Sequence, residues 1–474
     1  MSVRLAATGE QSRWLLLFLA AIVSFRLVTG VLYSLVTPPW QSPDEPRHFE
    51  HVRLLLERGR PLTVADTDPH LQRQILQSMV DSDFWSWFFG PRPKQTPGSF
   101  REIWPSHYTM LHRPSLYYWL GLPFLGLVSG RSLVAQLEAL RLFSVLLGVG
   151  TVLVAFLTAR VLFPQDAFMA LGTASFVALV PMYAWLSGML NNDNLATLAV
   201  SLLVLCVALM VRFGIKWQLG LATLAVAGLA VVTKRTSVAE VAVLPVVPII
   251  HYWGRRERHA RLAVRLAAAS LAVAAAVGGI VAFRPNLLPW LAKPLGSALL
   301  NSPDYALRLL DHPYLSWEFL QLLWRYAEVS VWSFWALFGW MNLSVDSIWY
   351  DALKVVHLGS AAGLLLLLVR SWLGRGSLHS FQAKALLLYV VSFGLLSVLA
   401  VAEAAYYFAP NHTPQGRYFF TLIVPIGLFF TLGWRELLPA GWRSPGLLAL
   451  MLFFFLFNSV CLFWYFLGWF RWSL

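Results

Sequence analysis

Long apolar segments separated by short polar connections dominate the sequence. Apolar runs of about 20 residues recur from residue 14 onward, which is the length that a helix needs to cross the hydrocarbon core of a bilayer. Backbone polar groups inside a bilayer must be satisfied within the protein, so isolated runs of this length predict helices. The pattern therefore predicts an all-α polytopic membrane protein.

The first apolar run, 14–36, follows Arg4 and Arg13 and is longer than the core of a signal peptide. We expect it to be an uncleaved anchor whose N-terminus lies in the cytoplasm. Further spans are predicted at 139–163, 167–187, 194–213, 217–233, 237–253, 262–283, 350–370, 384–405, 418–438 and 445–470. The total is 11 transmembrane helices, with 12 as the alternative.

The positions of lysine and arginine test this topology, because short cytoplasmic loops carry an excess of both. With the N-terminus inside, the internal loops hold Arg160, Arg212, the segment GRRERHAR at 254–261, Arg370 and Arg435. The charge bias is thus self-consistent.

Two long external loops follow from this topology. The first, 37–138, is expected to carry juxtamembrane helices, including a short apolar hairpin at 116–130. The second, 284–349, contains the apolar stretch 329–342, where we expect a re-entrant or surface-lying helix because a further span would invert every later loop. We expect residues 1–474 to form one transmembrane domain without a separate soluble domain.

Composition agrees with a membrane protein: 58% of residues are hydrophobic and 12% are charged. The net charge of +13 raises the question of a nucleic-acid partner, but the basic residues are scattered through short loops, so topology and anionic lipid explain them better. Cys206 and Cys461 both lie in apolar segments, which excludes a disulfide framework or a cysteine metal cluster.

Four unusual polar clusters fall on the external face of the predicted topology. They are the Asp44–Glu45 loop, SGMLNNDN at 187–194, TKRTS at 233–237 and NHTPQGRYF at 411–419. Convergence of four separate loops on one face indicates a functional site.

The first cluster opens a charged helix. Ser42 and Glu45 fit a capping box, which is the role that we favour for Glu45, and Pro46 fits best as the first helical residue. Asp44 lies at the mouth of this helix, whose apolar stripe predicts that it rests on the membrane interface. Asp44, Glu45 and His48 are candidate site residues, with a solvated helix cap as the alternative.

Two more polar residues, His112 and Arg113, precede the aromatic run of Tyr117, Tyr118 and Trp119. An aromatic belt at the membrane interface explains the aromatic run without any function. His112 and Arg113 are candidate substrate-binding residues.

Asn192 and Asp193 are candidates as well, although Asp193 or Asn194 could instead cap a helix. One carboxylate among asparagines is a poor cage for a hard cation, so no metal is expected unless Asp44 or Glu45 joins it.

Three cations lie at external membrane boundaries, where the positive-inside bias disfavours them. Lys234 and Arg235 are adjacent, and Arg417 lies in QGRYFF. Snorkelling explains single cations of this kind. Adjacent cations on the outer face are also what an anionic lipid head group needs, so we expect at least one of the three to bind phosphate.

The motifs SPDEPRHFEH, HRPSLYYW, RLFSVLLGVGTV, NNDNLA, TKRTS, SFWALFGWMN and QGRYFF, in this order, resemble the GT-C class of polyprenyl-phosphate-dependent membrane glycosyltransferases. The sequence is most similar to a bacterial branch related to the protein O-mannosyltransferases and the aminoarabinose lipid A transferases. The resemblance covers nearly the whole chain and implies a GT-C-type helix bundle.

The resemblance also implies roles for individual residues. The catalytic carboxylate of the first external loop corresponds to Asp44, and the HPPLYYW pattern of the class corresponds to His112–Trp119, with Arg113 and Ser115 as departures. The Asp-x-Asp of oligosaccharyltransferases is replaced by Asn191–Asn194, which argues against an essential metal of that kind.

We therefore expect an inverting transfer of a hexosyl or pentosyl unit from a polyprenyl-phosphate donor to a glycan, lipid or protein hydroxyl. The lipid phosphate is already a good leaving group, so one base is enough, and Asp44 takes that role. Lys234, Arg235 or Arg417 stabilises the departing phosphate. The site is expected at the outer face of the bacterial cytoplasmic membrane, in contact with membrane lipids, with no cofactor and no nucleic acid.

Two other functions compete with this one. A transporter or flippase for lipid-linked sugars would use the same cations without cleavage, but it predicts broken mid-membrane helices and internal symmetry, and neither is clear in the sequence. A non-catalytic scaffold of a cell-envelope complex is the third hypothesis.

Overall fold

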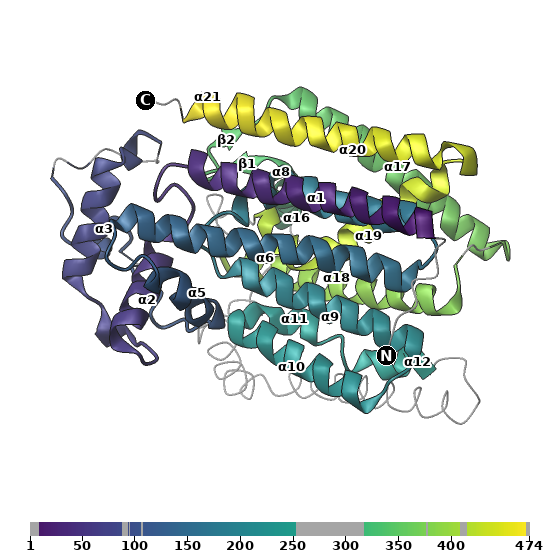
Figure 1. Ribbon diagram of the computed structural model, residues 1–474, viewed down its shortest axis with the longest axis horizontal. Coiled ribbons are helices and arrows are strands. Elements are labelled where there is room, and N and C mark those ends of the chain that lie inside the picture. Colours follow the sequence, from purple (N-terminus) through teal and green to yellow (C-terminus); the bar gives the residue numbers. More distant parts are fainter. Residues whose placement is uncertain are drawn as a thin grey trace.

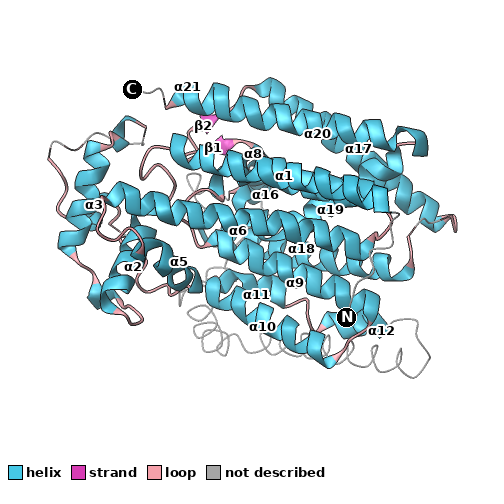
Figure 2. Cartoon of the chain, viewed as in Figure 1, coloured by secondary structure: helices cyan, strands magenta, loops and turns pink. Residues whose placement is uncertain are grey.

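Long helices lying side by side form the body of the protein (Figure 1). The computed structural model describes residues 9–87, 93, 95–105, 108–252, 317–375, 378–407 and 415–470. Helix α1 (Gly9–Val36) packs against α6 (Leu133–Leu162), and α6 packs in turn against α9 (Asp193–Phe213). The predicted all-α fold is confirmed for the described part of the chain, apart from one hairpin of two short strands (Figure 2).

Within the described ranges, seven helical segments are long and apolar enough to cross a membrane. They are Arg13–Val36, Leu133–Leu162, Asp193–Phe213, Ser347–Trp372, Ser380–Ala400, Gly416–Leu437 and Ala440–Trp469, and each matches a predicted span. A shorter apolar helix, α10 (Trp217–Thr233), coincides with another predicted span, whereas the predicted span 262–283 lies outside the described residues.

Two predicted spans are divided, and proline is the reason in both. The segment 167–187 forms α7 (Ala167–Leu179) and α8 (Pro181–Leu186), because Pro181 lacks an N–H and forces Val180 out of the helical conformation. The described part of the segment 237–253 begins at the end of η3 (Arg235–Ser237) and forms α11 (Val238–Val241) and α12 (Val246–Tyr252), with Pro245 at the break before α12.

The described residues between α1 and α6 fold as short helices at one end of the bundle (Figure 1). They are α2 (Glu45–Arg58), η1 (Val64–Asp66), α3 (Pro69–Asp81), η2 (Phe84–Ser86), α4 (Phe100–Ile103) and α5 (Leu116–Gly126). Their shared core includes Trp40, Phe49, Ile75 and Tyr117, all fully buried. The juxtamembrane helices that the sequence predicted are thus present, but α2 is covered on most sides by protein, so the prediction of a surface-lying α2 is wrong.

The C-terminal half begins, in the described residues, with α16 (Trp317–Trp335) and the hairpin of β1 (Leu337–Phe338) and β2 (Leu343–Ser344). The predicted re-entrant stretch 329–342 is therefore helical only up to Trp335 and then turns sharply. The preceding part of that predicted loop, 284–316, lies outside the described residues.

The remaining elements are α17 (Ser347–Trp372), α18 (Ser380–Tyr407), η5 (Gly416–Leu422), α19 (Ile423–Leu437), η6 (Ala440–Trp442), α20 (Arg443–Val460), the π-helical turn η7 (Cys461–Phe466) and α21 (Leu467–Trp469). Helices α17 and α19 approach so closely that a Cβ on Gly363 would collide with the carbonyl oxygen of Gly433. Small residues at such crossings let helix backbones touch, which favours association inside a bilayer.

Candidate active site

A polar cavity of about 260 Å³ lies where α2, α9, α11, α18 and η5 meet. Its charged lining residues are Asp44, Arg113, Asp193, Lys234, Glu240 and Arg417, and we call this space the polar cavity. Residues from each of the four predicted polar clusters line it, so the structure brings those clusters together. Of the ten candidate residues, Asp44, His48, Arg113, Asn192, Asp193, Lys234 and Arg417 line the cavity, whereas Glu45, His112 and Arg235 do not.

Asp44 occupies an unusual backbone conformation at the start of α2. Its φ of 68° is left-handed, which non-glycine residues rarely adopt and which aspartate and asparagine tolerate best. Its carboxylate makes no cap hydrogen bond but forms an ion pair with Arg47, and the side chain is 26% exposed. Strained residues of this kind cluster at functional sites, and the conformation leaves the Asp44 carboxylate at the cavity wall.

Glu45 does not form the predicted capping box, and that prediction is wrong. Its side chain is fully buried and accepts hydrogen bonds from Arg141 Nε at 2.9 Å and Arg141 Nη2 at 2.7 Å, as well as from the Leu190 N–H at 3.2 Å. Ser42 Oγ has no hydrogen-bond partner in the described part of the chain. Pro46 is the second helical residue, where its missing N–H still costs no intrahelical bond. The Glu45 carboxylate is thus taken up by Arg141 and is not available to a substrate.

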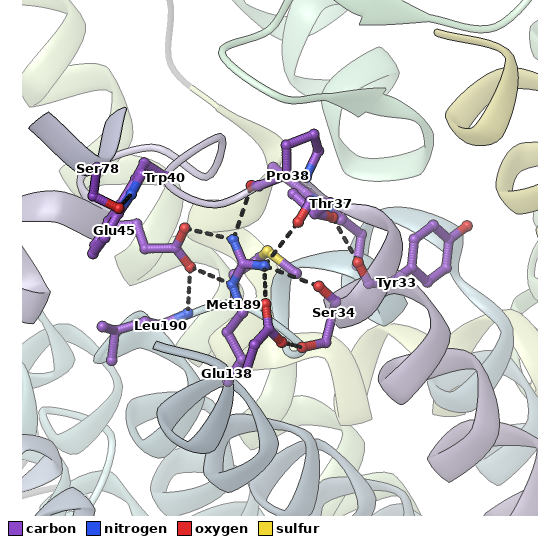
Figure 3. A network of polar contacts seen from close by, with 12 residues as sticks. Tyr33, Ser34, Thr37, Pro38, Trp40, Glu45, Ser78, Glu138, Met189 and Leu190 are labelled. Carbon is purple, nitrogen blue, oxygen red and sulfur yellow. Dashed lines mark hydrogen bonds and ion pairs between the residues drawn. The ribbon is translucent and has the colours of Figure 1, made fainter. Parts of the chain in front are cut away.

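Arg141 joins the first loop to the bundle through its bonds to Glu45. Figure 3 shows Glu45, Ser34, Thr37 and Glu138 converging in this polar network. Besides Glu45, Arg141 donates to the carbonyl oxygens of Ser34 at 2.9 Å and Thr37 at 2.8 Å, and to Glu138 Oε1 at 3.0 Å. These bonds hold the end of α1 against the start of α2. The helix that carries Asp44 is therefore fixed by a buried network. An arginine inside an apolar span is a signal that could have identified Arg141 from the sequence.

Two buried histidines of α2 contact Tyr118, which the sequence analysis assigned to an interfacial belt but which is only 1% exposed. His48 Nδ1 lies 2.8 Å from Tyr118 Oη, and the His51 ring stacks on Tyr118 with centroids 4.0 Å apart. Burial lowers the pKa of His48 to about 3 and that of His51 to about 4. Both imidazoles are thus neutral at physiological pH. Burial raises the pKa of the neighbouring Glu50 to about 7.

These shifts predict that His51 destabilises the folded state in acid. Its folded pKa lies below the usual 6.5, so the unfolded state binds more protons, and the contribution of neutral His51 is lost as the pH falls from 6.5 toward 4. The free energy of unfolding of His51→Gln, relative to that of wild type, should rise by about 2 kcal/mol when the pH is lowered from 7.5 to 5. Thermal unfolding of the purified protein at both pH values measures this gain.

The exposed His70 provides the control, because His70→Gln should show no such gain. Glu50 acts in the opposite direction, since its raised pKa costs stability as the pH rises, but it is present in every variant and cancels from the comparison. An equal pH response of His51→Gln and wild type would contradict the prediction.

Asp193 pairs with Lys234, whose Nζ lies 2.5 Å from Asp193 Oδ1. Asp193 is the first residue of α9, and its own N–H donates to Asn191 Oδ1 at 2.8 Å, so neither Asp193 nor Asn194 is the helix cap considered above. The capping acceptor is Asn191 instead. The pair joins the 187–194 and 233–237 clusters across the cavity.

Arg417 differs from the other cations of the cavity. It is 9% exposed, and its Nε and Nη1 have no hydrogen-bond partner among the described residues. Arg113, by comparison, is exposed and donates from Nε to His112 Nε2 at 3.2 Å. A buried guanidinium with free donors beside a cavity is suited to binding an anion, and its planar fork matches a phosphate group.

A larger apolar cavity, of about 1090 Å³, adjoins the polar cavity and shares Ala400 and Phe419 with it. Its walls come from α16, α17, α18, α19 and η5, and among the described residues that line it there is no Asp, Glu, Lys or Arg. We call this space the apolar cavity. Together the two cavities fit an amphiphile with a polar head and a long apolar chain.

The described residues contain no group of three or more histidine, cysteine, aspartate or glutamate side chains that could hold a metal ion. The sequence pattern does not predict Glu240 or Thr421 as cavity residues, and it predicts Tyr118 only as part of an interfacial aromatic belt. Glu240 had a signal of its own, because a carboxylate inside a predicted span is rare without a function. Tyr118 had none, since its aromatic neighbours are equally typical of a membrane interface.

Part of this chain matches a known protein family. Residues 113–280, or 168 of the 474 residues, match the model of the dolichyl-phosphate-mannose-protein mannosyltransferase family. The resemblance to GT-C glycosyltransferases is thereby confirmed. The matched stretch contains Arg113, Asp193, Lys234 and Glu240 of the polar cavity, whereas Asp44 precedes it and Arg417 follows it.

Two solved structures are similar to this chain at a low level. ArnT from Cupriavidus metallidurans bound to undecaprenyl phosphate is 13% identical, with 92% of this chain and 78% of that chain covered and a TM-score of 0.34. The apo state of the same protein is 16% identical, with the same coverage and a TM-score of 0.35. TM-scores of this size assign no role to any residue. No curated protein matches the chain.

Proposed function

We propose that this protein is an inverting glycosyltransferase that moves a sugar from a polyprenyl-phosphate donor to a hydroxyl group of a cell-envelope acceptor. The observation that carries the proposal is the junction of the polar and apolar cavities, with Arg417 on the polar side, where its Nε and Nη1 have no partner among the described residues. The family match over residues 113–280 supports the same chemistry. The active site would lie at the outer face of the cytoplasmic membrane.

The donor's phosphate binds at Arg417 in this proposal. Within the described ranges, Nε and Nη1 of Arg417 meet no acceptor, and Lys234 lines the same cavity. Because both cations lie in a partly enclosed site, their interaction with an anion is stronger than in bulk water. They also stabilise the negative charge that grows on the phosphate as the sugar leaves.

The donor's lipid chain occupies the apolar cavity. Residues such as Tyr326, Phe334, Leu367 and Phe393 line it, and burial of an apolar chain against them is favourable. A polyprenyl chain with a phosphate head would satisfy both cavities.

Asp44 is the general base. The acceptor hydroxyl oxygen attacks the anomeric carbon of the sugar, the bond from that carbon to the phosphate oxygen breaks, and the electron pair stays with the lipid phosphate. Asp44 takes the hydroxyl proton, so no second carboxylic acid is required. The attack from the face opposite the phosphate inverts the anomeric configuration, and no metal ion enters any of these steps.

Removal of Arg417 tests the phosphate site. Arg417→Met should weaken binding of the polyprenyl-phosphate donor roughly 10- to 100-fold, because charge-assisted hydrogen bonds to the phosphate are lost. Arg73→Met, an exposed arginine of α3 that lines neither cavity, should bind as wild type does. Equilibrium binding of labelled donor to purified protein in detergent measures both.

The function itself is tested by incubating wild type with a panel of polyprenyl-phosphate sugars and membrane extract as acceptor source. Release of polyprenyl phosphate together with a glycosylated product supports the proposal. Binding of donors without any turnover across the panel would favour the transporter or scaffold hypotheses instead.

A further inference from the structure

The polar cavity contains three carboxylates, and two of them are neutralised by a cation. Asp44 pairs with Arg47, and Asp193 pairs with Lys234. The third, Glu240 of α11, forms no ion pair with any residue of the described ranges. Glu240 is therefore the carboxylate of the polar cavity that has no paired cation in the described part of the chain.

Glu240 has one satisfied oxygen and one unsatisfied oxygen. Thr421 Oγ1 donates to Glu240 Oε1 at 2.5 Å, whereas Oε2 has no partner among the described residues although the side chain is only 2% exposed. A buried carboxylate oxygen without a donor costs free energy, and such groups in native proteins require an explanation. Because Glu240 lines the polar cavity, the ligand of that cavity can supply the missing donor.

The requirements of Arg417 and Glu240 are complementary. In the part of the chain that the structure describes, Arg417 has donors without an acceptor, whereas Glu240 has an acceptor without a donor. Glu240 lies six residues after Lys234, and Arg417 lies four residues before Thr421, the residue that donates to Glu240. A ligand with an anionic group and a nearby hydroxyl group satisfies both.

We propose that Glu240 Oε2 accepts a hydrogen bond from a hydroxyl group of the donor's sugar, and that Thr421 holds the carboxylate in the required orientation. The inference rests on the proposed function, because it takes the ligand to be a polyprenyl-phosphate sugar. It makes Glu240 a specificity-determining residue, since a buried acceptor left unpaired rejects a sugar that lacks the matching hydroxyl.

Two ligands separate this role from phosphate binding: a polyprenyl-phosphate sugar, and polyprenyl phosphate without a sugar. Glu240→Met removes the acceptor at similar volume and should weaken binding of the sugar donor roughly 10- to 100-fold. It should leave binding of polyprenyl phosphate unchanged or slightly tighter, because a negative charge is removed. Glu240→Gln should lose only part of the sugar-dependent affinity.

Glu50→Gln is the matched control, because Glu50 is also a fully buried glutamate but lies outside the polar cavity. It should bind both ligands as wild type does. A set of donors that each lack one hydroxyl completes the test. One of them should bind wild type more weakly, and the same hydroxyl should make no difference to Glu240→Met.

The outcomes are distinguishable. Loss of sugar-donor binding alone in Glu240→Met supports the inference, whereas equal loss for both ligands, or no loss for either, overturns it. An unchanged ranking of the deoxy donors in Glu240→Met also overturns it. If wild type binds neither ligand, the proposed function fails first and the inference fails with it.

Discussion

Asp44→Asn should lower the turnover of the donor by about 10²- to 10⁴-fold while leaving donor affinity within a few-fold of wild type. Asparagine has the same shape as aspartate and tolerates the left-handed backbone at φ 68°, so the start of α2 is preserved. What is lost is the group that takes the acceptor's proton. Single-turnover transfer and equilibrium donor binding, measured on the same preparation, separate the two effects.

Asp193→Asn provides the comparison, because Asp193 is the other ion-paired carboxylate of the polar cavity. Its removal frees Lys234 and should alter donor binding more than the chemical step. Full turnover by Asp44→Asn would reject Asp44 as the base. A larger loss of turnover in Asp193→Asn than in Asp44→Asn would move that role to Asp193.

Arg141→Met should lower the free energy of unfolding by about 3–5 kcal/mol, because it leaves the fully buried Glu45 carboxylate without its cation. The same change removes the donors to the carbonyl oxygens of Ser34, Thr37 and Pro38. Thermal unfolding of the purified variant measures the loss. Since these bonds hold α2 in place, we also expect turnover to fall below the level explained by the unfolded fraction.

A double variant separates the ion pair from the rest of the network. Glu45→Gln combined with Arg141→Met should be more stable than Arg141→Met alone, because no buried charge is then left unpaired. Wild-type stability in Arg141→Met, or no recovery in the double variant, would show that the buried pair does not anchor α2.

Most membrane helices could be predicted from the sequence because each depends on the composition of its own segment. The runs at 194–213, 350–370 and 384–405 lie on helices whose ends fall within a few residues of the prediction. The two divided spans contain prolines that interrupt the helix. The apolar run continues through each proline, so hydrophobicity alone does not reveal the break. The polar clusters could also be predicted, because polar residues at membrane boundaries stand out in so apolar a chain.

Within the site, the sequence indicated residue types but not their partners. Asp44, Lys234 and Arg417 line the polar cavity as expected of site residues, whereas Glu45, adjacent to Asp44, turns the other way to meet Arg141, 96 positions later. One residue of shift along a helix rotates a side chain by about 100°, so neighbouring carboxylates take different environments. Local spacing favoured a capping box because it carries no information about an arginine on another helix.

The sequence by itself determined that this protein is a helical membrane protein whose acids and cations fall in a few polar clusters. Apolar length and local charge are properties of short segments, and they do not require knowledge of the neighbours. Only the tertiary structure decided which charges are paired and which are left free for a ligand. Among the described residues, Glu45 is paired with Arg141, whereas two nitrogen atoms of Arg417 and one carboxylate oxygen of Glu240 have no partner. Burial makes each polar group depend on atoms brought close from distant parts of the chain.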